Sequence, residues 1–278
     1  MGRYLRPVRL DDALAALGPG VTVVAGGTDH FPARVLHTPE EDILDITALP
    51  LRSIVRHDDH WWIPCLATWT DLIEADLPPQ FDALVQAARQ IGGRQVQNAA
   101  TLVGNLCNAS PAADGFPCFL ALDAEVELAS QNGTRRLPVA QFVHGPRRTD
   151  RRPDELVLGL RIPHAPAARS HFRKLGGRRY LVISIAMLAV VLECDPGGRI
   201  TRACIAIGAC SPQALRLRAL EEALIGHPPG ADLVQPHHLD CLSPIDDIRA
   251  TAAYRRHAAL ELTRRAVAHF AIPTSIAA

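Results

Sequence analysis

The feature of this sequence that most limits its fold is an apolar run at residues 180–192, which is rich in valine and isoleucine. It lies between Arg179 and Glu193 and is well short of the roughly 20 residues that a membrane-spanning helix needs. Because β-branched side chains pack well on a pleated sheet, the run predicts a buried strand or a pair of strands. The turn at residues 195–198 and the apolar segment at residues 200–207 predict a hairpin partner.

Shorter strands and helices are predicted on both sides of this hairpin. Apolar residues between turn signals indicate strands, and apolar residues at helical spacing indicate helices. The further strands are predicted at residues 21–25, 124–129, 135–139, 156–162 and 171–175, and the helices at residues 11–17, 80–91, 212–224 and 248–270. Mixed strands followed by packing helices predict an α+β fold.

The length of the chain allows two domains. With 278 residues, of which 48% are hydrophobic, it can bury two cores or one core with a smaller satellite. A proline-containing linker at residues 163–166 marks the predicted boundary. We therefore predict a first domain over residues 1–164, with subdomains of about 1–55 and 56–164, and a C-terminal α+β domain over residues 165–278.

The charge balance excludes two classes of partner. The 29 Lys and Arg residues equal the 29 Asp and Glu residues, so the formal net charge is zero. Such a chain has no general attraction to phosphate backbones or anionic lipid surfaces, and we expect neither a nucleic-acid partner nor a membrane span. The first seven residues lack an apolar core of signal-peptide length, which predicts a cytoplasmic location.

Neither the cysteines nor the histidines predict a metal site. The seven cysteines show no C-x-x-C spacing, so we interpret them as small buried hydrophobes. They are Cys65, Cys107, Cys118, Cys194, Cys204, Cys210 and Cys241. His57 and His60 flank two aspartates, but apolar residues on either side favour a hairpin turn over a metal site.

A first candidate binding loop, Ala25-Gly26-Gly27-Thr28-Asp29-His30, directly follows a predicted strand. Glycines let backbone N–H groups converge closely on an anion such as a pyrophosphate. The loop contains neither G-x-G-x-x-G nor G-K-[ST], so the Rossmann and P-loop modes do not apply. Alone, it fits an ordinary turn equally well, and we interpret the Asp29 side chain as structural or directed at a sugar.

A second candidate loop, Thr101 to Asp114, is uncharged except for its last residue and rich in Asn, Ala, Ser and Thr. An apolar run at residues 116–122 follows it. An uncharged polar stretch beside an apolar segment suits a buried polar ligand better than a solvated loop. The two loops together predict a dinucleotide site.

Several motifs, in order along the chain, carry a resemblance to a known family. They are Val24-Ala25-Gly26-Gly27-Thr28-Asp29, Gln95 to Asn105, Asn108 to Asp114, Gly145-Pro146-Arg147-Arg148-Thr149, Glu155-Leu156-Val157, Arg173-Lys174-Leu175-Gly176 and Ile205 to Ala209. In this order they resemble the FAD-binding subunit of the xanthine dehydrogenase and carbon monoxide dehydrogenase family of molybdenum hydroxylases. The resemblance covers nearly the whole chain.

The resemblance implies a vanillyl-alcohol-oxidase-type FAD fold of two subdomains plus a C-terminal α+β domain. It implies that the two loops hold the pyrophosphate and ribityl of FAD, that Asp114 touches the cofactor, and that Cys107 and Leu158 lie near the flavin ring. The residues assigned to cofactor binding are therefore Ala25, Gly26, Gly27, Thr28, Asp29, His30, Thr101, Gly104, Asn105, Cys107, Asp114 and Leu158. Asp114 also fits the N-cap of a helix that begins at Gly115.

The resemblance also implies an electron-transfer role that needs partner subunits. A large subunit with a molybdenum cofactor would oxidise the substrate, and a small subunit with 2Fe–2S clusters would pass electrons to FAD. NAD+, a quinone or oxygen would then accept them. We expect a dimer of heterotrimers, with no catalytic acid–base residue and no metal ligand on this chain.

Two other functions stay open at this point. One is a self-sufficient flavin oxidase of the same fold, although the chain offers no large substrate domain. The other is an assembly or binding protein that has lost FAD. Val103 keeps the second alternative open, because it stands where the family more often has the first glycine of Thr-x-Gly-Gly-Asn.

Overall fold

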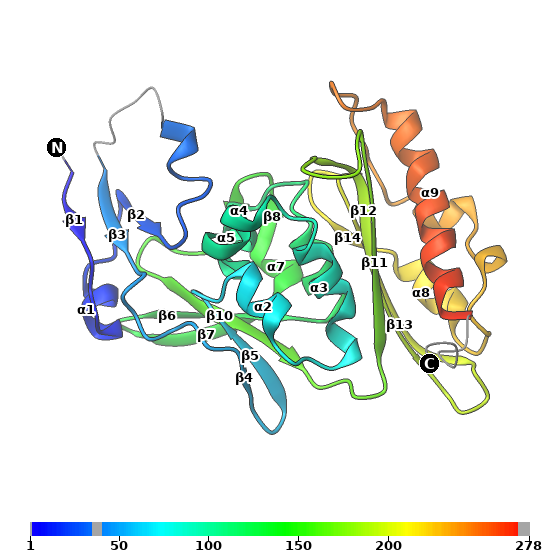
Figure 1. Cartoon of the computed structure of the whole chain (residues 1–278), viewed down its shortest axis with the longest axis horizontal. Helices are drawn as coiled ribbons and strands as arrows, with labels where there is room; N and C mark the ends of the chain where they lie inside the picture. The colour runs from blue at the N-terminus through cyan, green and yellow to red at the C-terminus, as the bar shows by residue number, and fades with distance from the viewer. Residues whose placement is uncertain (1, 35–40, 272–278) are drawn as a thin grey trace. The chain divides into compact units, whose positions relative to one another are not determined.

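The computed structural model describes residues 2–34 and 41–271, and the chain divides into two compact units (Figure 1). Unit 1 comprises residues 1–75, 92–109 and 123–164. Unit 2 comprises residues 76–91, 110–122 and 165–278. Each unit is thus built from three separate stretches of sequence.

Unit 1 begins with a small parallel sheet in the order β1-β3-β2. Its strands are β1 (Tyr4–Leu5), β2 (Val21–Val24) and β3 (Asp42–Asp45), and α1 (Leu10–Ala15) lies between the first two in sequence. The predicted helix at residues 11–17 and strand at residues 21–25 are confirmed with shifted ends. Because β2 ends at Val24, the first candidate loop starts at the carboxyl end of a parallel strand, where ligands commonly bind.

A five-stranded antiparallel sheet in the order β4-β5-β10-β6-β7 forms the rest of the framework of unit 1. Its strands are β4 (Val55–Arg56), β5 (His60–Pro64), β6 (Glu125–Ser130), β7 (Gly133–Pro138) and β10 (Leu156–Pro163). Arg56 pairs with Trp61 across the β4–β5 turn, which confirms the predicted hairpin at the two histidines. Within the described residues, no group of three or more His, Cys, Asp or Glu side chains fits a metal ion.

Helices and a short hairpin complete unit 1. They are η1 (Pro32–Arg34), α2 (Trp69–Glu74), α4 (Arg94–Ala99), α5 (Leu102–Asn108), α7 (Val139–Phe142), β8 (Val143–Gly145) and β9 (Arg148–Thr149). Thr68 starts α2 with a capping box that also uses Asp71. The predicted second loop is wrong in part, because residues 102–108 form the helix α5. Their mixture of Asn, Gly and Leu has no clear helical period, so the sequence did not indicate a helix.

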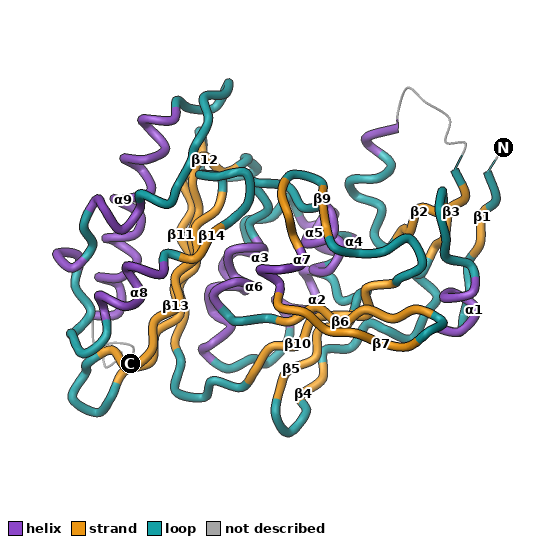
Figure 2. The backbone as a smooth tube through the Cα atoms, turned by 180° about the vertical axis from the view of Figure 1, so that it is seen from behind, coloured by secondary structure: helices purple, strands orange, loops and turns teal. Residues whose placement is uncertain are grey.

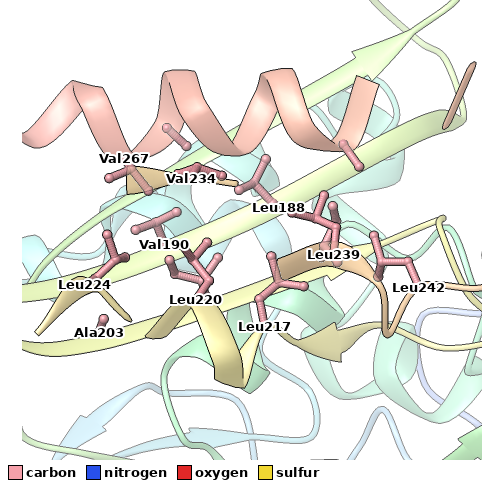
Figure 3. Packing of buried hydrophobic residues seen from close by; sticks show 14 of the residues in the cluster. Leu188, Val190, Ala203, Leu217, Leu220, Leu224, Val234, Leu239, Leu242 and Val267 are labelled. Carbon is pink, nitrogen blue, oxygen red and sulfur yellow. The ribbon is translucent and has the colours of Figure 1, made fainter. Parts of the chain in front are cut away.

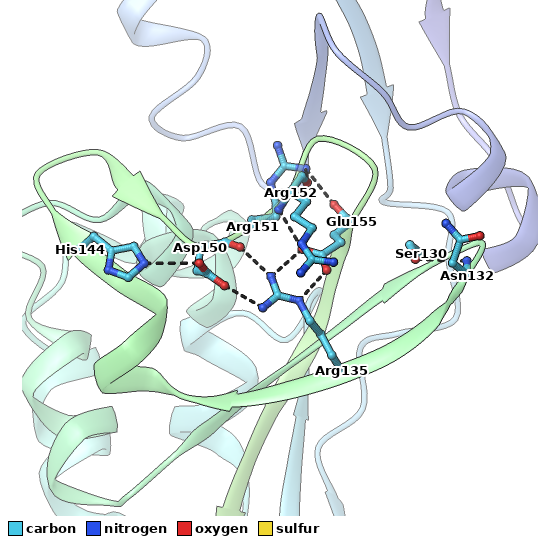
Figure 4. A network of polar contacts seen from close by, with 8 residues as sticks. All are labelled: Ser130, Asn132, Arg135, His144, Asp150, Arg151, Arg152 and Glu155. Carbon is cyan, nitrogen blue, oxygen red and sulfur yellow. Dashed lines mark hydrogen bonds and ion pairs between the residues drawn. The ribbon is translucent and has the colours of Figure 1, made fainter.

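A polar network fixes the segment between β9 and β10 (Figure 4). Arg135 of β7 donates to Glu155 Oε1 at 2.6 Å, to Asp150 Oδ2 at 2.7 Å and to the Asp150 carbonyl at 2.6 Å. The Glu155 side chain is almost fully buried and also accepts from the Arg152 backbone N–H at 2.8 Å. Charge-assisted bonds of this kind hold a loop in one geometry.

Unit 2 is a four-stranded antiparallel sheet in the order β11-β12-β13-β14, covered by helices (Figure 2). The strands are β11 (Arg169–Gly176), β12 (Ser184–Cys194), β13 (Ile200–Gly208) and β14 (Leu215–Arg216). The long apolar run is therefore confirmed as a buried strand from Ser184 onward, with the predicted hairpin to β13. Its first four residues precede the strand, and Tyr180, Leu181 and Ile183 are exposed, so burial of that part was predicted wrongly. Helices α8 (Arg218–Leu224) and α9 (Ala252–Ala268) lie on one side of the sheet, and α3 (Asp82–Ala88) and α6 (Gly115–Ala121) lie on the other. The segment η2 (Pro79–Phe81) contacts β11.

Strand β12 is buried without a break from Ser184 to Leu192, as expected for a strand whose sheet has helices on both sides. Leu188 and Val190 pack with Leu220, Leu224 and Val267 of the helices α8 and α9, all at most 2% exposed (Figure 3). The 3-10 segments η3 (Ala231–Leu233), η4 (Pro236–Leu239) and η5 (His269–Ala271) border this core. The sheets and helices of the two units confirm the predicted α+β class.

Two sequence predictions in this region are wrong. The predicted helix at residues 212–224 starts only at Arg218, because residues 215 and 216 extend the sheet as β14. Cys194 and Cys241 are exposed, whereas burial was predicted for all seven cysteines. No helix in the described ranges is long and apolar enough to cross a membrane.

Candidate functional site

The first loop packs its backbone directly against the residue that ends α4. A Cβ atom added at Gly26 would lie 1.8 Å from the Ala99 carbonyl oxygen and 2.6 Å from its carbonyl carbon. No side chain fits there unless the backbone moves. Gly27 has φ +66°, a left-handed conformation that favours glycine. The Gly-Gly pair is therefore required by geometry, and it places the first loop beside the start of the second motif.

Thr101 is the N-cap of α5 and is buried. Its Oγ1 accepts from the Gly104 backbone N–H at 2.9 Å, and the Leu102 N–H donates to the Ala67 carbonyl at 3.0 Å. A Cβ atom at Gly104 would lie 2.7 Å from Thr101 Oγ1, so glycine keeps the cap undisturbed. Gly104 itself is exposed, and backbone at this turn of the helix is open to a ligand.

Asn105 follows directly and carries a buried acceptor. Among the residues that the structure describes, its Oδ1 atom has no hydrogen-bond partner. An unpaired buried acceptor is costly, so such atoms are typically satisfied by a ligand or an ordered water. A hydroxyl of a sugar or sugar alcohol supplies the donor that this atom lacks, which fits the ribityl chain of a flavin dinucleotide.

The remaining residues of the first loop have different surroundings. Thr28 is exposed. Asp29 accepts from Arg147 at 2.7 Å, so its carboxylate is paired within the protein. His30 contacts Arg34 and stacks edge-on against Phe31. Burial and the neighbouring Arg34 lower the pKa of His30, which keeps this side chain uncharged at neutral pH.

Cys107 and Leu158 meet through a shared neighbour, Cys65. The Cys65 N–H donates to the Leu158 carbonyl at 2.8 Å, and Cys107 lies near enough to Cys65 to add to the rise in the pKa of its thiol. Burial raises the pKa of both thiols to about 12. Both are therefore protonated thiols at neutral pH and offer a weakly polar, unreactive surface rather than nucleophiles.

Asp114 belongs to unit 2, whereas the other predicted site residues belong to unit 1. Its carboxylate accepts from Lys174 at 2.6 Å and from the Ser184 hydroxyl at 2.5 Å. Burial raises the pKa of Asp114 above its ordinary value, against the opposing effects of Lys174 and Ser184. Asp114 stands at the N-cap position of α6, but its side chain makes no capping bond, so that part of its predicted role is wrong.

The structure adds two residues that we did not assign to the site from the sequence. Arg147 contacts the first loop and the end of α5. Lys174 is the partner of Asp114, and it is the single lysine among the 29 basic residues of the chain. That rarity was a usable sequence signal, because it sets this position apart from 28 arginines.

Val103 occupies a buried position in the first turn of α5 and is 4% exposed. We expect Val103→Gly, which restores the more common motif, to lower the free energy of unfolding by about 2–3 kcal/mol, since it removes a packed side chain and adds a glycine to a helix. Urea unfolding of the cofactor-free chain measures this. Unchanged stability would show that Val103 contributes nothing to the packing of α5.

Comparisons with known proteins agree along most of the chain. A family described as "FAD binding domain in molybdopterin dehydrogenase" matches residues 1–165, and one described as "CO dehydrogenase flavoprotein C-terminal domain" matches residues 170–270. The putative xanthine dehydrogenase FAD-binding subunit of Escherichia coli is 30% identical over 281 aligned residues, which cover 95% of this chain and 94% of that protein. The glyceraldehyde dehydrogenase medium chain of Sulfolobus acidocaldarius is also 30% identical, covering 95% and 96%.

Solved structures give the same result. A chain of carbon monoxide dehydrogenase from Hydrogenophaga pseudoflava superimposes with a TM-score of 0.87 at 28% identity, covering 96% of both chains.

Proposed function

The chain belongs to the family of FAD-binding subunits of molybdopterin dehydrogenases, and we propose that it passes electrons through FAD within a molybdenum-containing hydroxylase or dehydrogenase. This result confirms three predictions: the family, the α+β fold class and the assignment to FAD-dependent oxidoreductases. The details of the site, the partner subunits and the electron acceptor are our proposal.

The observation that carries the proposal is the packing of Gly26 against Ala99. It joins two motifs that are more than 70 residues apart in the sequence. In our proposal the backbone N–H groups of the first loop bind an anionic group that lies beside the second motif. The unpaired Oδ1 atom of Asn105 lies in the same unit and offers an acceptor to a hydroxyl donor. A pyrophosphate attached to a polyhydroxylated chain matches both requirements.

Each proposed ligand-binding residue is assigned to one part of the FAD molecule. Ala25, Gly26, Gly27 and Thr28 offer N–H donors to the pyrophosphate, while Thr101 holds the first turn of α5 so that Gly104 stays accessible. Cys107 and Leu158 form an uncharged surface suited to an aromatic ring. Bound FAD would supply the redox chemistry, which these side chains lack, so the protein's part is binding and orientation.

The proposed partners follow because, in our proposal, this chain binds and orients FAD but does not itself oxidise a substrate. A large subunit with the molybdenum cofactor would oxidise the substrate, and a small subunit with 2Fe–2S clusters would deliver electrons to this chain. NAD+, a quinone or oxygen would accept them, and two heterotrimers would form the complete enzyme. The names of the relatives as a dehydrogenase FAD-binding subunit and a medium chain support this proposal.

The test is titration of the purified full-length chain with FAD, followed by flavin fluorescence and visible absorbance. We expect saturable binding of one FAD per chain, and reduction of the bound flavin by dithionite but by no simple alcohol or amine donor. A chain that binds no FAD would favour the assembly-protein alternative. A chain that reduces oxygen with a small donor and no partner would favour the self-sufficient oxidase.

A further inference from the structure

Arg147 connects three segments of unit 1 that are distant in the sequence. Its Nη1 atom donates to Asp29 Oδ2 at 2.7 Å and also to Asn108 Oδ1. Its backbone N–H donates to the Ala109 carbonyl at 3.0 Å. The turn between β8 and β9 is thereby attached both to the first candidate loop and to the C-terminal end of α5.

The backbone at this junction is held in an unusual conformation. Arg147 has φ +59° and Ala109 has φ +46°, and both residues carry side chains that disfavour this left-handed region. Such conformations persist where the surrounding structure fixes them, and they are common at binding sites. The network of Arg135 with Asp150 and Glu155 fixes the segment that follows β9, so the Arg147 turn is anchored from the other side as well (Figure 4).

The charges at this junction also matter for an anionic ligand. Asp29 belongs to the glycine loop, and its side chain is 57% exposed, so an unpaired carboxylate there would repel a pyrophosphate. The guanidinium of Arg147 neutralises it. Arg148, the next residue, is also exposed, and its side chain makes no hydrogen bond or ion pair within the described part of the chain.

We propose that Arg147 is a positioning residue for the dinucleotide site: it ties the loop at residues 25–30 to the end of α5 and neutralises Asp29. The inference rests on the proposed FAD-binding function and adds a residue to it. Arg147 acts through Asp29 and Asn108, so its loss changes where the loop lies and what charge it presents.

The experiment compares FAD affinities of full-length variants by quenching of flavin fluorescence. We expect Arg147→Gln to weaken FAD binding by about tenfold, since it removes a charge-assisted contact and exposes a carboxylate. The matched control Arg148→Gln should bind like the unchanged protein. The double variant Asp29→Asn with Arg147→Gln should bind FAD more tightly than Arg147→Gln alone, because the repelling charge is gone.

Thermal unfolding of the FAD-free variants separates positioning from a loss of fold. We expect the same Tm for Arg147→Gln and Arg148→Gln. If Arg147→Gln does not fold, Arg147→Gly, which tolerates the positive φ, takes its place in the same titration. Equal FAD affinity of the Arg147 and Arg148 variants would overturn this inference while leaving the proposed function intact. Absence of FAD binding by the unchanged chain would refute the proposed function instead.

Discussion

Replacement of Gly26 by alanine should abolish tight FAD binding. The new Cβ atom would lie 1.8 Å from the Ala99 carbonyl oxygen, and both are attached to backbone, so no change of rotamer relieves the overlap. The first loop must therefore move away from α4 and from the second motif. We expect at least about a hundredfold loss of affinity, equivalent to roughly 2.7 kcal/mol. The forced backbone shift should also lower the free energy of unfolding by about 1–3 kcal/mol.

A matched control for this change is Gly18→Ala. No atom lies within 4 Å of a Cβ atom built at Gly18, so alanine fits there. Fluorescence titration with FAD and urea unfolding should distinguish the two variants clearly, with Gly18→Ala close to the unchanged protein. FAD affinity in Gly26→Ala equal to that of the control would mean that the contact between the two motifs does not organise the cofactor site.

The second large effect concerns the buried pair of Asp114 and Lys174. Both side chains are at most 7% exposed, and Lys174→Met would leave a buried carboxylate without its cation. Removing one member of such a pair typically costs about 3–5 kcal/mol of unfolding free energy. The loss should be largest near neutral pH, where Asp114 would have to be charged or take up a proton.

The pH dependence of this effect has a defined sign. Burial already raises the pKa of Asp114 in the folded protein, and removal of Lys174 raises it further. The folded state then binds more protons than the unfolded state above the ordinary pKa of an aspartate, so the stability of Lys174→Met falls as the pH rises through this window. Urea unfolding at several pH values should show the deficit shrink on acidification.

Two further variants test whether the unpaired charge of Asp114 causes the loss of stability in Lys174→Met. Combining Lys174→Met with Asp114→Asn should recover part of the stability, because the buried charge is gone. Arg94→Met removes the exposed pair with Glu74, and it should cost less than about 1 kcal/mol. A deficit in Lys174→Met that is small and independent of pH would show that Asp114 is not held by this pair.

Local features of the fold were predictable where one residue pattern dominates. The Val- and Ile-rich run at residues 180–192 was confirmed as a strand from Ser184 onward, and its predicted hairpin to the apolar segment at residues 200–207 was also confirmed. The helix α5 was missed because it is set by the Thr101 cap and by packing under β10, not by periodicity. Similarly, an apolar face shows that α3 needs a partner but not that β11 is that partner.

The candidate site could be predicted as a list of residues but not as an arrangement. The glycines and Asn105 were identified by motif, yet the 1.8 Å approach at Gly26 depends on the position of Ala99. Arg147 was missed as a site residue because an arginine in a turn is usually solvated. Only the fold shows that its side chain reaches Asp29, which lies 118 positions earlier.

The burial of Lys174 gives the chain an unusual chemical property. Since it is the single lysine, every side-chain amine of the protein is shielded in the folded state by Asp114 and the surrounding core. Acylating reagents that label most proteins at many surface positions should leave this side chain unmodified until unit 2 opens. The rate of acylation at Lys174, measured by mass spectrometry, therefore reports the rate at which the C-terminal sheet opens. No engineered probe is needed for this measurement.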